Sequence, residues 1–143
     1  MEQDRSQQLI GSWQLLSAQL EMADTGERLD LFGPDPIGRL ILTSNGRMAA
    51  VLTASGRAAA VDVPGMAALF GSMMAFSGTF RHDNSAKLVF GCDMAWHPAW
   101  VGTEQVRFYE LSEDRLTLRT GRQTHPRYPG REVYGFLDWR REE

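Results

Sequence analysis

Three polar side chains alternate along one predicted strand in the second half of the chain: Gln105, Arg107 and Tyr109. Successive side chains of a β-strand point to opposite faces, so these three share one face. If that face points into a closed barrel, the Arg107 guanidinium needs a carboxylate or an anionic ligand, because an unpaired buried charge is costly. The alternative is that Arg107 lies in solvent or pairs with Glu21 or Asp138.

Arg39 is the second basic side chain whose strand position could place it against a bound anion. It shares a strand face with Ile37, Ile41 and Thr43, and that face lies either inside a barrel or on its outer surface. The predicted chemistry is the orientation of a carboxylate, an enolate or a phenolic oxygen, by Arg107 and secondarily by Arg39.

Aromatic side chains gather in the short segment Trp96-His97-Pro98-Ala99-Trp100. Near the mouth of a barrel the two tryptophans would stack on a ligand. Alternatively, they cap the core and His97 lies in solvent. Apolar side chains of the neighbouring strands would complete the wall of a cavity. The predicted lining is Phe80, Phe90, Met94, Trp96, Trp100, Phe108 and Tyr109.

Residues that hold metals or perform nucleophilic catalysis are sparse and scattered. The three histidines lack the close spacing of a metal site, and the single cysteine, Cys92, has no recognisable His/Asp frame. We therefore expect no metal and no cofactor. Cofactor-free isomerisation, cyclisation or decarboxylation stays open, with a buried Asp93, His97 or Tyr109 as the acid or base.

The composition of the 143-residue chain restricts its partners and its compartment. A hydrophobic fraction of 43% is enough for a core, and the length is typical of one domain over residues 1–143. The net charge of −3 argues against a nucleic acid partner. Neither a membrane-spanning run of roughly 20 apolar residues nor a secretory signal is visible. With one cysteine and no internal disulfide, we expect a cytoplasmic protein without a membrane partner.

The hydrophobic pattern predicts short antiparallel strands joined by tight turns. The expected strands are residues 13–22, 28–32, 37–43, 47–53, 77–82, 87–94, 103–111, 115–120 and 132–140. The clearest turn is Asn45-Gly46, a pair that supplies the positive φ angles of tight hairpins. Eight or nine strands in consecutive hairpins are typical of an up-and-down antiparallel barrel.

Two helices are predicted outside the strands. Residues 4–10 would form one or two turns, with Asp4 or Ser6 as the N-cap. The second helix is expected over about residues 64–75, because Pro64 suits a first turn and apolar side chains recur at helical spacing. This Met-rich helix would be a lid, a dimer contact or a helix packed on the sheet.

Several short motifs follow one another along nearly the whole chain. They are Leu9-Ile10-Gly11-Ser12-Trp13, Pro36-Ile37-Gly38-Arg39-Leu40-Ile41-Leu42-Thr43, Asn45-Gly46-Arg47-Met48, Ser77-Gly78-Thr79-Phe80, Trp100-Val101-Gly102-Thr103-Glu104-Gln105-Val106-Arg107, Asp114-Arg115-Leu116-Thr117-Leu118 and Trp139. Together these motifs resemble the bacterial lipocalin-like domain family of the calycin superfamily. The resemblance implies an all-β, lipocalin-like up-and-down barrel with a short N-terminal helix and one inserted helix. It implies no settled activity and no catalytic set.

The resemblance also implies roles for two aromatic residues. Trp13 would pack across the closed end of the barrel, with a cation–π contact from Arg140 or Arg141. Phe80 stands where many relatives are expected to carry a tyrosine, so a polar group in or near the cavity would be missing here.

The sequence therefore favours a barrel that binds a small hydrophobic or amphipathic molecule, with an anionic group as one version. Two alternatives remain: a cofactor-free isomerase or cyclase on the same barrel, and an interaction module with a filled interior. The interaction module would be a homodimer. Strand register decides the lining, because a slip of one residue reverses every inward and outward assignment.

Overall fold

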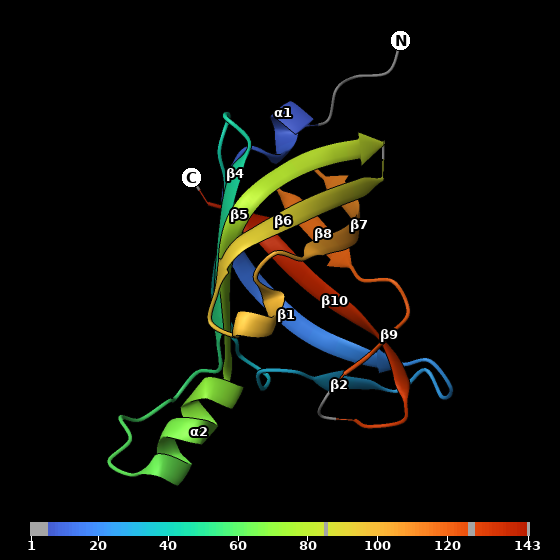
Figure 1. Ribbon diagram of the computed structural model, residues 1–143. Helices are drawn as coiled ribbons and strands as arrows, with labels where there is room; N and C mark the ends of the chain where they lie inside the picture. The colour runs from blue at the N-terminus through green and yellow to red at the C-terminus, as the bar shows by residue number, and fades with distance from the viewer. Residues whose placement is uncertain (1–5, 85, 126–127, 143) are drawn as a thin grey trace.

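The computed structural model describes residues 6–84, 86–125 and 128–142, whose strands coil into an antiparallel β-barrel (Figure 1). The strands are β1 (Gly11–Met22), β2 (Arg28–Asp30), β3 (Ile37–Leu42), β4 (Arg47–Thr53), β5 (Met73–Asn84), β6 (Lys87–Ala95), β7 (Glu104–Ser112), β8 (Arg115–Arg119), β9 (Gln123–Thr124) and β10 (Glu132–Arg141). The helices are α1 (Ser6–Leu9), α2 (Val63–Gly71) and the 3-10 turn η1 (Pro98–Trp100). The predicted all-β, lipocalin-like architecture with an N-terminal and an inserted helix is confirmed.

Eight strands of the described chain close the barrel, and two short strands extend it at one end. The order of paired strands is β2-β1-β3-β4-β5-β6-β7-β8-β10-β9, and β1 also pairs with β10. Apart from that closing pair, the strands of the barrel wall follow their order in the sequence, which is the up-and-down pattern. β2 pairs with residues 19–21 of β1, and β9 with residues 132–133 of β10, at the same end of the barrel.

β1 contains a bulge that changes which of its side chains point inward. Its register with β10 shifts between Leu15 and Ser17. Before the shift an odd-numbered side chain such as Trp13 is buried, and after it the even-numbered Ala18 and Leu20 are buried. A bulge inserts one extra residue into a strand, so the inward face moves from odd to even positions. This explains why the segment alternates imperfectly in the sequence.

The end of the barrel beside α1 is closed by Trp13, which is fully buried. Its indole Nε1 donates a hydrogen bond to the carbonyl of Leu9 at 2.9 Å. The Arg141 guanidinium lies 4.3 Å from the centroid of the Trp13 ring, donates to the carbonyl of Ile10 at 2.9 Å and also donates to the carbonyl of Gln8. The predicted cation–π contact is therefore confirmed, with Arg141 as the partner.

Both predicted helices are present. α1 forms inside the predicted span of residues 4–10, and the N-cap candidate Asp4 lies outside the described residues. The Asp62 carboxylate caps α2 by accepting a hydrogen bond from the backbone N–H of Gly65 at 2.8 Å, and Pro64 occupies the first turn. Within the part of the chain that the structure covers, every helix is too short or too polar to cross a membrane.

The predicted end of the second helix at residue 75 is wrong. α2 ends at Gly71, and Met73, Met74 and Phe76 belong to β5. The helix ends before Met73 because the backbone of Met73 pairs with Thr53 of β4. Tertiary pairing thus overrides the helical spacing of these apolar side chains. As a result, β5 brings methionine and phenylalanine side chains to the barrel wall where a helix was expected.

The hairpin at Asn45-Gly46 joins β3 to β4 as predicted, but through a different turn. Gly46 has a φ of 82°, whereas Asn45 has no positive φ. The backbone N–H of Thr43 donates to the carbonyl of Arg47 at 2.9 Å, and that of Gly46 donates to Thr43. One residue with positive φ therefore makes this turn, where a type I′ turn would need two.

The closed end gives a test of stability. We expect Arg141→Met to lower the free energy of unfolding by about 2 kcal/mol or more, because it removes charge-assisted hydrogen bonds and a cation–π contact. Urea unfolding followed by tryptophan fluorescence measures the loss. The matched control is Arg140→Met on the exposed face of the same strand, with an expected effect within about 0.5 kcal/mol. Equal losses in the two variants would contradict this role for Arg141.

Candidate functional site

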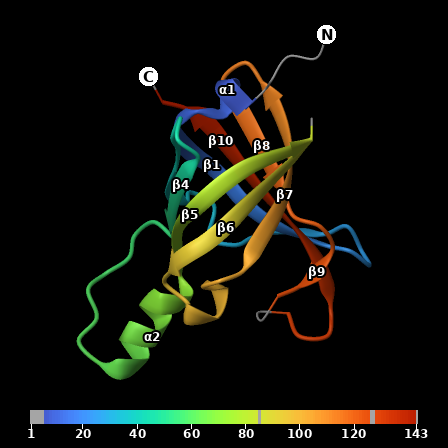
Figure 2. The same cartoon turned by 45° about the horizontal axis from the view of Figure 1, so that its top comes forward.

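The end of the barrel away from α1 opens into a cavity of about 690 Å³. α2, η1 and β9 lie around this end (Figure 2), and each contributes residues to the lining. The fully buried side chains of Leu40, Leu52 and Trp139 line its inner part. The cavity is therefore a one-ended chamber whose far end is closed by the packed core around Trp13.

α2 projects beyond the barrel and forms part of the rim (Figure 1). None of its residues is buried, so it does not pack a hydrophobic face on the sheet. Arg57 fastens its C-terminal end, with Nη2 donating to the carbonyl of Leu69 at 2.8 Å and Nε to Oγ of Ser72 at 3.0 Å. A cation at this end also complements the helix dipole. The helix is thus held by polar contacts at one end, while Phe70 reaches the cavity.

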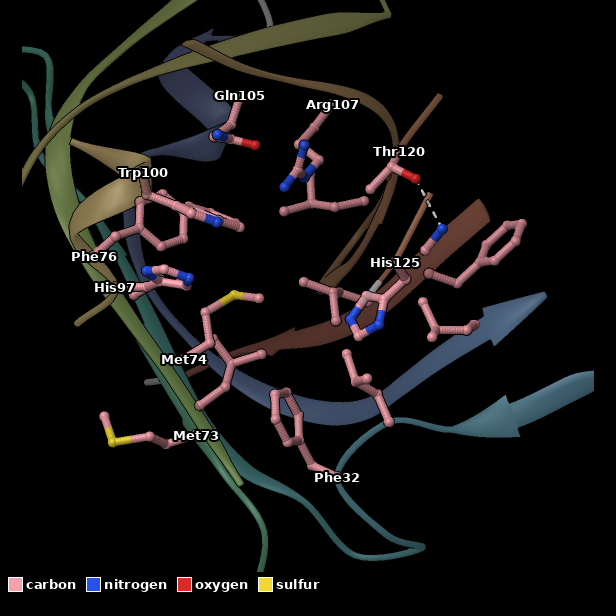
Figure 3. Close-up of a pocket in the computed structure, with 18 of the residues that line it drawn as sticks. Phe32, Met73, Met74, Phe76, His97, Trp100, Gln105, Arg107, Thr120 and His125 are labelled. Carbon is pink, nitrogen blue, oxygen red and sulfur yellow. Dashed lines mark hydrogen bonds between the residues drawn. The ribbon is translucent and has the colours of Figure 1, made fainter. Parts of the chain in front are cut away.

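Arg107 points into the cavity (Figure 3) and is only 9% exposed. Its Nη1 donates to the carbonyl of Val106 at 2.9 Å, and no carboxylate of the described residues makes an ion pair with it. The two predicted partners are engaged elsewhere, Glu21 with Arg28 and Asp138 with hydroxyl groups. Burial lowers the pKa of Arg107 to about 10, which leaves the side chain a cation at neutral pH.

The electrostatics of the cavity differ from those of the whole chain. The chain has a net charge of −3, yet the described lining residues include no aspartate or glutamate. Arg107 is the one arginine or lysine among them, and the lining also contains two histidines, His97 and His125. Because the surrounding wall is largely apolar, the charge of Arg107 is weakly screened there.

Four of the predicted ligand-contacting residues line the cavity: Phe90, Trp96, Trp100 and Arg107. Trp96 and Trp100 lie 5.3 Å apart between ring centroids, at a T-shaped angle of 66°. Both tryptophans contribute to the wall of the cavity, as one of the two readings of that segment expected. His97 is exposed, as the other interpretation of that segment expected, and its side chain also borders the cavity.

Two aromatic candidates lie in the interior but outside the cavity. Tyr109 is 5% exposed, and its hydroxyl is 2.6 Å from Nε2 of His82. Phe80 is partly buried against the core. Neither side chain lines the cavity, so their assignment to the site is corrected. A tyrosine in place of Phe80 would therefore not restore a polar group to the lining.

Three further candidates point outward, which corrects their assignment as well. Met94 is 66% exposed. Phe108 lies on the outer face, where the Arg119 guanidinium is 4.8 Å from the centroid of the Phe108 ring. Arg39 is exposed on β3 and forms a bidentate ion pair with Glu142, at 2.8 and 3.1 Å. In each case the neighbouring side chain on the same strand occupies the interior.

Several lining residues were not predicted. Met74 and Phe76 come from the start of β5, and Thr120 and His125 come from the segment after β8. The pair on β5 could have been found from the alternation of apolar side chains that continues to Phe80 along the same face. The segment after β8 carries no regular pattern, so sequence reasoning had no signal for its inward residues.

The remaining candidates for catalysis are placed away from the cavity or without partners for chemistry. Asp93, a possible base if buried, is exposed and pairs with Arg47 at 2.7 Å. Cys92 is buried in the core, and burial raises the pKa of its thiol. Among the residues of known placement, no cluster of three or more His, Cys, Asp or Glu side chains could hold a metal ion.

An eight-stranded barrel with a one-ended chamber defines a class of proteins that hold small ligands in their interior. Residues 10–142 match the family described as the lipocalin-like domain, and the chain belongs to that family. It is also similar to a solved lipocalin-like protein from Bacteroides uniformis, with 17% identity and a TM-score of 0.49. That match covers 94% of this chain and 98% of the other. No curated protein matches the chain.

The placement of Arg39 gives a pH-dependent prediction. The hydrogen bonds from Arg39 lower the pKa of Glu142 most, a hydrogen bond from Ser12 lowers it further, and the pKa falls from 4.5 to about 2. The folded state therefore favours the ionised carboxylate, so the pair stabilises the fold above pH 4.5, and this contribution is lost as the pH falls through about 2. We expect Arg39→Leu to unfold more easily than the wild type at neutral pH, with the difference vanishing near pH 2 in urea titrations.

The same variant tests the assignment of Arg39 to the outer surface. Since its side chain lies outside the cavity, Arg39→Leu should bind any anion held at Arg107 as tightly as the wild type does. Isothermal titration calorimetry at neutral pH makes the comparison. A substantial loss of affinity would return Arg39 to the site.

Proposed function

We propose that this protein binds a small amphipathic molecule inside its barrel and holds an anionic oxygen group of that molecule at Arg107. The observation that carries the proposal is the burial of Arg107, whose side chain is only 9% exposed in an otherwise largely apolar chamber. None of the described residues forms an ion pair with its guanidinium. A buried cation is costly unless it is paired. An anionic ligand would supply that pair through charge-assisted hydrogen bonds.

The size of the chamber supports a small molecule as the partner. Its volume of about 690 Å³ falls within the range of roughly 300–1,000 Å³ that is usual for ligand pockets. An interaction module with a filled interior would not need such a volume. Binding of a small ligand therefore accounts for both the void and the charge that faces it.

The alternative of a cofactor-free enzyme finds less support. Of its three acid–base candidates, Asp93 is exposed and Tyr109 lies outside the lining. His97 lines the chamber and remains as a single candidate. General acid–base catalysis of isomerisation usually needs a second group to stabilise or return the proton. We therefore favour binding without chemical conversion.

Native mass spectrometry tests the proposal directly. The purified protein is incubated with a small-molecule extract of the cells that produce it, and the mass of the complex is recorded. We expect one discrete adduct that releases an unchanged acid. Arg107→Met should weaken this adduct about thirtyfold or more, because truncating one partner of a buried charge pair costs about 2 kcal/mol or more. Arg119→Met, on the outer face, is the matched control and should keep the adduct.

Two results would contradict the proposal. The absence of any adduct, or an adduct of equal strength in Arg107→Met, would remove Arg107 from a binding site. Consumption of one compound with the appearance of another would instead identify an enzyme.

A further inference from the structure

One side of the cavity is built from an unbroken row of aromatic rings. Phe70 at the rim lies 6.2 Å from Trp96, which is 5.3 Å from Trp100. Trp100 is 5.2 Å from Phe76, which is 6.2 Å from the buried Phe90. These centroid distances fall within the range of favourable aromatic pairs. The aromatic row, defined as these five residues, therefore runs from the mouth of the cavity into its interior.

Polar side chains of the lining gather on the other side of the cavity. Figure 3 shows Arg107, Thr120 and His125 across the cavity from Trp100 and Phe76, with Gln105 beside Arg107. The Gln105 amide nitrogen donates to Oγ1 of Thr103 at 2.8 Å, which directs its oxygen away from that bond as an acceptor. Guanidinium donors and an amide acceptor are thus next to each other on this side.

Donor and acceptor groups of this polar side would be expensive to cover with hydrocarbon. A straight-chain acid can pair its carboxylate with Arg107, but its alkyl chain is apolar all round and would leave the Gln105 amide without a partner. A flat ring system can place its face on aromatic side chains and its edge oxygens on polar ones. The division of the cavity into two sides therefore selects for a ligand that has two sides itself.

We infer that the ligand is a planar conjugated or aromatic acid with oxygen substituents along one edge, in preference to a straight-chain acid. Its ring lies against the aromatic row, with Trp100 at the centre. Its carboxylate or other acidic oxygen meets Arg107, and a neighbouring hydroxyl donates to the Gln105 oxygen. This inference rests on the proposed function and specifies the chemical class of its ligand.

The first experiment compares two acids by isothermal titration calorimetry with the whole 143-residue chain. The probes are 3-hydroxy-2-naphthoate, which has a flat ring and two adjacent oxygen groups, and dodecanoate, a straight-chain acid. We expect the naphthoate to bind at least tenfold more tightly. Tighter binding of dodecanoate would overturn the inference and leave the proposed function intact. Failure of both acids to bind would overturn the proposed function and the inference together.

The second experiment changes the aromatic row. Trp100→Leu should weaken the naphthoate about tenfold and dodecanoate less than threefold, whereas Trp100→Phe keeps a ring and should restore most of the naphthoate affinity. Phe108→Leu removes a ring from the outer face and should alter neither affinity. Equal losses for both acids in Trp100→Leu would overturn the inference. If Trp100→Leu does not fold, Trp96→Leu tests the adjacent ring of the row in the same way.

Discussion

Closure of the sheet by β1 and β10 is the constraint on which the rest of the structure depends. These two strands pair from Trp13 opposite Arg141 to Met22 opposite Val133. The pairing turns a row of consecutive hairpins into a barrel, and a barrel gives every strand an inner face. Without it, Arg107 would lie on one surface of an open sheet and would be hydrated. Closure therefore creates both the cavity and the cost of burying a charge within it.

The hairpins were predictable because their signals are local, as Gly46 shows for one turn. The contact of Trp13 with an arginine of the last strand has no local signal, and it was expected only because the motifs of the whole chain resemble a known family. For β7 the sequence could only say what would follow if the Arg107 face pointed inward, because both faces of this strand mix polar and apolar side chains. Arg39 was misplaced because the neighbouring strands decide which face of β3 is inward. Met94 was misplaced because the pairing of β5 with β6 shifts register between Ser77 and Gly78, so Met94 leaves the face on which Cys92 is buried.

The end of α2 and the start of β5 show a different limit. Apolar side chains from Met66 to Phe76 recur at helical spacing, yet the chain changes from helix to strand between Gly71 and Met73. Pairing with β4 makes that decision, and single-sequence periodicity contains no information about β4. Met66 therefore lies in the helix as the sequence predicted, whereas Met73 and Met74 lie in a strand.

Because α2 is attached to the barrel at one end only, the part of the rim that it forms contributes little to the stability of the barrel. The helix buries none of its residues, and Arg57 binds its C-terminal end, next to β5, through two polar contacts. Apart from Arg57, most side chains between residues 55 and 69 are exposed, so changes among them should cost little free energy of folding. For the ligand binding that we propose, the rate of exchange and the stability of the fold can therefore change separately. For protein engineering, loops can be exchanged in this segment to change the rate at which a ligand enters, while the barrel itself is kept.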